Sequence, residues 1–191
     1  MWDSSALCRP GCHDTRVNDH RFMSEPPLHL VLYQPEIPYN AGAVARTCVA
    51  LGAKLWLVRP LGFQLDDKHM RRAGLDYWEH LDWEVVDDWN ALLHALPDRR
   101  AWFFSKTAAK HYTDAEFQQG DILVFGSESL GLPRSILEAD PQRCLRIPIR
   151  PQTRSLNLSV SAGIAAFEAR RQLVAAGSIS AEPETPLEDD G

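Results

Sequence analysis

Apolar and polar positions along the chain follow two alternating patterns, one typical of strands and one typical of helices. Short apolar runs predict buried strands at 28–33, 54–58, 83–86, 101–105, 122–125 and 145–149. Apolar residues at helical spacing predict helices at 41–51, 66–73, 88–96, 133–139 and 157–174. Strands that alternate with helices are typical of a mostly parallel sheet with helices on both faces. The sequence therefore predicts an α/β fold.

Several predicted helix ends carry residues that favour such ends. Asn40 is placed to cap the helix over 41–51, and Gly52 is placed to end it. Pro97 stops the helix over 88–96, and Pro133 falls in the first turn of the next one. The last helix has two candidate caps, Ser155 and Asn157.

Composition divides the chain into three regions. Residues 1–27 mix Cys, Arg, Asp, His and Pro without periodicity, and we expect a disordered arm or a non-native extension upstream of Met23. Residues 175–191 are rich in Pro, Glu and Asp and too polar to fold alone, which predicts a disordered acidic tail. The folded domain is expected at 28–174.

The formal net charge of the chain is −6, which argues against a nucleic-acid partner at first sight. Much of it comes from the tail, whereas residues 28–174 carry 17 acids and 17 Lys or Arg residues. The neutral charge of the domain argues against an RNA partner. A local basic cluster, however, can bind phosphate whatever the total charge of the domain. Both interpretations stay open on charge alone.

The chain has neither an apolar run long enough to span a bilayer nor a secretory signal pattern, so we expect a cytoplasmic protein without a membrane partner. Its four cysteines suggest no disulfide framework. Two of them and two histidines lie close together near the N-terminus, but their spacing matches no strong zinc pattern, and we expect no metal. This group is Cys8, Cys12, His13 and His20.

Three loops that follow predicted strands carry candidate chemistry, because ligands of parallel sheets bind at the carboxyl ends of the strands. The first, 34–42, leads to Arg46. That arginine is either a surface residue of a capped helix or a guanidinium that grips a phosphate with two hydrogen bonds.

The second loop, 126–133, has glycines that allow close approach of the backbone to a ligand, or that simply suit the turn. It matches neither a Walker loop nor a dinucleotide fingerprint. The third loop, 150–159, has more polar residues than capping requires. It is either a ligand-facing turn or a helix cap.

Taken in this order, the loops resemble the motifs of the SPOUT superfamily of RNA methyltransferases. The matching blocks run from Asn40 to Arg46, from Gly126 to Pro133 and from Ser155 to Ser159. The segments 32–38, 66–77 and 146–148 are similar to one subfamily, the small tRNA (cytidine/uridine-34) 2′-O-methyltransferases. The resemblance covers about 28–174.

The resemblance implies a C-terminal trefoil knot, a homodimer, S-adenosyl-L-methionine as cofactor and the ribose of the tRNA wobble nucleotide as methyl acceptor. It also implies roles for individual residues. The cofactor would contact the backbone of Phe104, Gly126, Ile147 and Ser155. Catalysis would use Arg46, Ser155 and Asn157, and RNA would contact Asn40, Glu128 and Arg154.

The family suggests Arg46 as a base or an assistant to one. A guanidinium keeps its proton in proteins, so holding the neighbouring phosphate is the physically easier role. The chain departs from the subfamily at 105–107, where Ser-Lys-Thr replaces the usual Thr-Thr-Lys. Alternatives are a methyltransferase for another RNA such as rRNA, or an inactive RNA-binding module. A Rossmann-type nicotinamide enzyme would need the glycine fingerprint that is missing.

Overall fold

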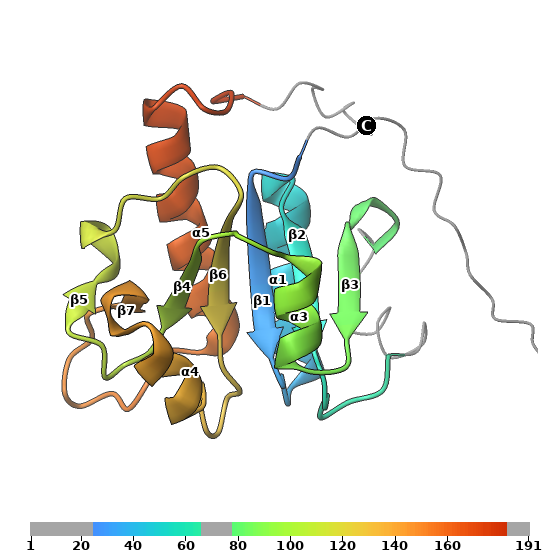
Figure 1. Cartoon of the computed structure of the whole chain (residues 1–191), viewed down its shortest axis with the longest axis vertical. Coiled ribbons are helices and arrows are strands. Elements are labelled where there is room, and N and C mark those ends of the chain that lie inside the picture. The colour runs from blue at the N-terminus through green and yellow to red at the C-terminus, as the bar shows by residue number, and fades with distance from the viewer. Residues whose placement is uncertain (1–24, 66–77, 183–191) are drawn as a thin grey trace, which may run out of the picture.

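The computed structural model describes residues 25–65 and 78–182, and these contain a seven-stranded sheet in the order β3-β2-β1-β6-β4-β7-β5 (Figure 1). Every neighbouring pair of strands is parallel, as predicted. The strands are β1 (Leu28–Tyr33), β2 (Lys54–Val58), β3 (Trp83–Val86), β4 (Ala101–Phe104), β5 (Lys110–His111), β6 (Asp121–Phe125) and β7 (Cys144–Arg146).

Helices cover both faces of the sheet, again as predicted. They are α1 (Pro38–Leu51), α3 (Trp89–Ala95), α4 (Arg134–Ala139) and α5 (Leu158–Ala175), with short 3-10 helices η1 (Trp78–His80), η2 (Tyr112–Asp114) and η3 (Pro141–Arg143). Figure 1 shows α3 and α4 in front of the sheet and α1 and α5 behind it. None of the helices in the described part of the chain is long and apolar enough to span a membrane.

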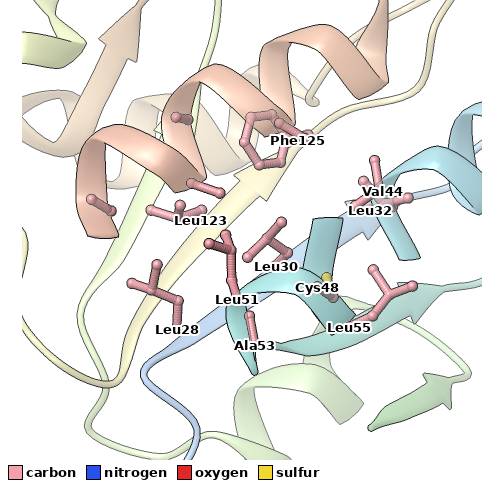
Figure 2. Close-up of a cluster of buried hydrophobic side chains, with 14 of the residues drawn as sticks. Leu28, Leu30, Leu32, Val44, Cys48, Leu51, Ala53, Leu55, Leu123 and Phe125 are labelled. Carbon is pink, nitrogen blue, oxygen red and sulfur yellow. The ribbon is translucent and has the colours of Figure 1, made fainter. Parts of the chain in front are cut away.

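The two faces follow from the alternation of side chains along each strand. Leu30 and Leu32 of β1 pack with Val44 and Cys48 of α1 in one cluster (Figure 2). The intervening Val31 belongs to the opposite cluster, which contains residues of α3 and α4. Burial in the first cluster raises the pKa of the Cys48 thiol well above its usual value, so this cysteine serves packing.

Helix α1 begins earlier than the sequence pattern indicates. Its first residue is Pro38, its N-cap is Ile37, and the prediction that Asn40 caps this helix is wrong. A proline suits the first helical position because it has no N–H to satisfy there. The amide of Asn40 is buried and has partners outside the helix. Gly52 does end the helix, in the left-handed conformation (φ 64°).

Smaller differences concern β7 and β5, the last two strands in the order of the sheet. A strand was predicted over 145–149, but β7 ends at Arg146, so Ile147 follows the strand instead of lying inside it. Pro148 has no N–H for a ladder hydrogen bond, which limits further pairing. β5 was not predicted, because two residues are too short to show a period. The helix predicted at 66–73 lies outside the described residues.

The segment after α5 stays in contact with the domain as far as the structure describes it. The backbone N–H of Ser178 donates to Leu173 O (2.9 Å), and Ile179 packs against the larger hydrophobic cluster. Arg170 Nη2 donates to Ala181 O (2.8 Å). These contacts hold residues 178–181 against the domain.

Candidate functional site

Three polar loops meet at one edge of the sheet. They follow β1, β6 and β7, and all three strands lie within the neighbouring set β1-β6-β4-β7. Chain order reverses beside β1, with β2 and β3 on one side and the later strands on the other. Such a reversal is where open parallel sheets bind ligands. In Figure 1 the arrows of β1, β4 and β6 point to this edge, at the bottom of the view.

Glu128, in the loop after β6, is the centre of the hydrogen bonds that join the loops. Its carboxylate accepts from the backbone N of Glu36 (2.8 Å), the backbone N of Ile37 (3.2 Å) and Asn40 Nδ2 (2.8 Å). All three donors lie at or just before the start of α1, where a negative charge is favourable. Glu128 therefore fixes the beginning of α1 to the second loop.

Asn157 adds the third loop to this group. Its Nδ2 donates to Asn40 Oδ1 (2.9 Å), while its Oδ1 accepts from Ser159 N (2.9 Å), Ser159 Oγ (2.7 Å) and Val160 N (3.4 Å). Asn157 is thus the N-cap of α5, which resolves the choice between it and Ser155. The chain Glu128–Asn40–Asn157 connects the three loops directly.

A second link joins the first two loops. The carboxylate of Glu36 accepts from Ser129 N (3.1 Å) and from Ser129 Oγ. Behind Glu36 the backbone of Gly62 approaches closely, since a Cβ on Gly62 would lie 2.7 Å from Glu36 Cα. Sequence reasoning singled out neither Glu36 nor Ser129, because no spacing or period pairs residues so far apart in the chain.

Gly126 is required by the geometry of its own loop. A Cβ there would lie 2.0 Å from the carbonyl carbon of Gly131, and Gly131 itself has φ 72°. The loop closes through a hydrogen bond from Gly131 N to Ser127 O (2.9 Å). Both glycines therefore serve the turn, the simpler of the two interpretations from the sequence, and the cofactor role of Gly126 stays a prediction.

The other expected cofactor residues lie at neighbouring strand ends. Phe104 ends β4, pairs with Phe125 of β6 and stacks on its ring with centroids 4.7 Å apart. Ile147 immediately follows β7, which pairs with β4. The structure thus brings Phe104, Gly126 and Ile147 to three adjacent strand ends. Ser155 and Arg154 are exposed in the loop before α5.

Arg46 lies in α1 on its exposed side, away from the core that the helix covers. It lines an open hollow of about 280 Å³ between α1 and Phe167 of α5. The remaining lining residues are Tyr39, Gly42, Ala43, Thr47 and Ala50. A guanidinium in such a place is accessible to a phosphate from solvent.

No group of three His, Cys, Asp or Glu side chains suited to a metal ion occurs within residues 25–65 and 78–182. The N-terminal group of two cysteines and two histidines lies outside these ranges, so the expectation for it stays a prediction.

Comparison with known proteins gives consistent similarities. The family model of the SpoU rRNA methylases matches residues 27–167. A tRNA (cytidine(34)-2′-O)-methyltransferase of Methylovorus glucosotrophus is 47% identical over 152 residues, which are 78% of this chain and 98% of the relative. One of Burkholderia cenocepacia with the same name is 48% identical over 148 residues, 76% and 95% of the two chains.

A solved structure from work on the 2-OH methylation of C/U34 on tRNA is similar as well. It is 52% identical, superposes with a TM-score of 0.74 and covers 78% of this chain and 97% of its own. The similarity in sequence and in fold therefore spans the whole region that holds the three loops.

Proposed function

Because the chain belongs to the SpoU rRNA methylase family, we propose that it methylates the ribose 2′-hydroxyl of the wobble nucleotide of tRNA, position 34, with cytidine or modified uridine as the base. The expected membership among RNA methyltransferases is confirmed by the family match. The relatives that carry the wobble-position name are covered almost completely by this chain.

The observation that carries the proposal is the direct connection of three polar loops at one edge of the sheet. Through Glu128, Asn40 and Asn157, the start of α1, the loop after β6 and the start of α5 become one hydrogen-bonded unit. Such a unit can hold two reactants in fixed relative positions, because its loops are already ordered and lose little conformational entropy when the reactants bind. Asn40 and Glu128 support the site through these internal bonds, and contact of either with RNA is part of the proposal.

S-adenosyl-L-methionine is the proposed cofactor. The backbone at the ends of β4, β6 and β7 fits it, because the N–H and C=O groups of Phe104, Gly126 and Ile147 lie at adjacent strand ends and can read an adenine edge. Ser155 would complete this contact from the loop before α5. The bound sulfonium supplies a methyl group that is already activated.

The remaining task of the protein is to place the ribose oxygen in line and to assist loss of its proton. We assign Arg46 to the phosphate next to that ribose, where a fixed positive charge also favours the alkoxide. Arg154 is a second phosphate contact, and Ser155 and Asn157 orient the ribose and the cofactor. The role of Arg46 as base is the alternative.

The variant Arg46→Ala tests this assignment. We expect methyl transfer to tRNA to fall by about 100-fold or more, since the transition state loses a charged contact, while calorimetry still detects cofactor binding. Arg134→Ala is the matched control, because Arg134 is exposed on α4 and pairs with Glu138 at the surface (3.5 Å). Near wild-type transfer by Arg46→Ala would remove Arg46 from the mechanism.

The site of methylation is tested with the RNA. Purified protein should methylate tRNA whose position 34 is a ribonucleotide and leave the same tRNA with a 2′-deoxy nucleotide there unmodified. Mass spectrometry of tRNA from a strain without the protein should show loss of the 2′-O-methyl group at that position. Transfer to rRNA in place of tRNA favours the other substrate class, and no transfer to either favours an RNA-binding module.

The proposal includes a homodimer. Helices α1 and α5 pack on the same face of the sheet and expose large apolar side chains beside one another. Tyr39 is 66% exposed, Phe167 53% and Val160 48%. Exposed apolar groups of this kind mark protein interfaces.

The trefoil knot and the cytoplasmic location belong to the proposal too. β7 lies in the sheet between β4 and β5, which precede it in the chain, and residues 147–157 then return to α5, which packs on α1 and β6. This path is compatible with a knot, and a crystal structure traced through these residues tests it. Fractionation of cells tests the location.

A further inference from the structure

Glu36 and Ser129 make contacts that the mechanism above does not use. Ser129 donates two hydrogen bonds to the Glu36 carboxylate, from its backbone N (3.1 Å) and from its hydroxyl. Glu128, the residue before Ser129, accepts from the backbone N of Glu36 and of Ile37 in return. Each of the two loops therefore contributes a carboxylate that accepts hydrogen bonds from the other loop. We call the side-chain part of this contact, between Glu36 and Ser129, the clasp.

The Glu36 side of the clasp is held in place by its own loop. Pro35 and Pro38 restrict the backbone on either side of Glu36. Gly62 N donates to Pro35 O (2.9 Å), and a Cβ on Gly62 would lie 2.8 Å from Glu36 O. The carboxylate is thus presented to Ser129 from a backbone that has little freedom to move.

In the proposed function, one loop of the clasp belongs to the RNA side of the site and the other to the cofactor side. The loop with Glu36 continues directly into α1, which carries Arg46 on the RNA side. The loop with Ser129 starts at Gly126, on the cofactor side. We propose that Glu36 and Ser129 are positioning residues, which hold α1 and the cofactor loop at the separation that in-line methyl transfer needs. This inference rests on the proposed function.

A positioning role predicts a particular kinetic signature. A displacement of about 1 Å between reactants lowers the rate strongly even when both still bind. We therefore expect Ser129→Ala to lower kcat about tenfold. The KM for tRNA and the Kd for S-adenosyl-L-methionine should stay within about twofold of wild type, because neither residue of the clasp binds either reactant in this proposal.

Ser129→Thr is the matched rescue variant. It keeps the hydroxyl that donates to Glu36, and since Ser129 is exposed the added methyl group has room. We expect Ser129→Thr to recover most of the lost kcat. Glu36→Gln has nearly the same shape as wild type but offers one acceptor oxygen instead of two, so its kcat should also fall. The double variant Glu36→Gln/Ser129→Ala should lose less than the product of the two single losses.

The experiment uses the full chain, a wobble-position tRNA and S-adenosyl-L-methionine in steady-state and single-turnover assays, with the Tm of every variant measured in parallel. Glu84→Gln is the control for loss of a surface carboxylate, since Glu84 lies in β3 and bonds Lys54 (3.1 Å). It should keep the wild-type kcat.

Three outcomes would overturn the inference. One is a wild-type kcat for Ser129→Ala. Another is a Thr variant as impaired as the Ala variant, and the third is a raised KM with unchanged kcat, which indicates direct binding of substrate. If the wild-type protein transfers no methyl group to RNA, the proposed function is wrong, and the inference on the clasp fails with it. If the wild type is active and the variants behave as in one of the three outcomes, only the inference on the clasp is wrong.

Discussion

His29 is a buried titratable side chain in β1, only 3% exposed. Its Nδ1 accepts a hydrogen bond from Trp56 Nε1 (3.1 Å). Burial, together with the positive charges of Arg99 and Lys54 and against an opposing effect of Glu25, lowers the pKa of His29 from 6.5 to about 4. The folded protein therefore holds this histidine neutral.

This pKa shift predicts a loss of stability in mild acid. Between pH 6.5 and 4 the unfolded chain binds a proton at His29 that the folded chain does not, so stability falls as the pH falls through this window. The loss reaches up to about 3 kcal/mol by pH 4, at about 1.4 kcal/mol per pH unit. Urea unfolding of wild type and His29→Gln at pH 7, 5 and 4 measures it.

The glutamine variant does not titrate, and its amide oxygen can still accept from Trp56. Its free energy of unfolding should therefore decline less than that of wild type over the same window. Parallel decline of the two proteins would show that His29 does not cause the acid sensitivity.

At the scale of elements, Asp121 ties the start of β6 to β4. It is 2% exposed, and its carboxylate accepts from Arg100 Nε (2.9 Å) and Nη2 (2.7 Å), Trp102 Nε1 (2.8 Å) and Gln118 N (2.9 Å). Removal of one partner of a buried ion pair leaves the other without compensation and typically costs about 3–5 kcal/mol.

We expect Asp121→Asn to lower the free energy of unfolding by about 3 kcal/mol, measured by urea titration at pH 7. The exposed pair Lys54–Glu84 is the reference, and Glu84→Gln should cost under about 1 kcal/mol. Equal losses in the two variants would mean that burial adds nothing to the contact of Asp121.

Strands β1, β2 and β3 could be predicted to the residue from the sequence. β1, β2 and β3 are apolar runs with clear ends, as strands buried in a parallel sheet are. The start of α1 was missed because Asn40 has the chemistry of a cap, while its actual partners Glu128 and Asn157 lie 88 and 117 residues away. Local patterns carry no information on such partners.

At the scale of the whole molecule, the predicted parallel sheet placed the three motif loops at the carboxyl ends of strands, and so at one edge of the sheet. The hydrogen bonds between the loops could not be predicted from the sequence. They depend on the alignment of β1 with β6, where Leu32 lies opposite Phe125, and on the tight turn from Gly126 to Gly131. Only the folded sheet sets the distance between Glu36 and Ser129.

The exposed face of α1 and α5 leads to the last prediction, which concerns assembly. If Tyr39, Val160 and Phe167 are buried between two copies of the chain, their removal from water supplies much of the binding free energy. A carboxylate at position 167 would then be desolvated without a partner, at a cost of several kcal/mol. Phe167→Asp should therefore raise the dimer dissociation constant by about 100-fold or more.

Sedimentation equilibrium over a range of concentrations measures this constant. Leu93→Asp is the matched control, because Leu93 is comparably exposed at 49% but lies on α3, on the opposite face of the sheet. Wild type and Leu93→Asp should sediment as two chains, and Phe167→Asp as one. Dissociation by Leu93→Asp alone would place the interface on α3, and a single-chain mass for wild type would exclude the dimer at those concentrations.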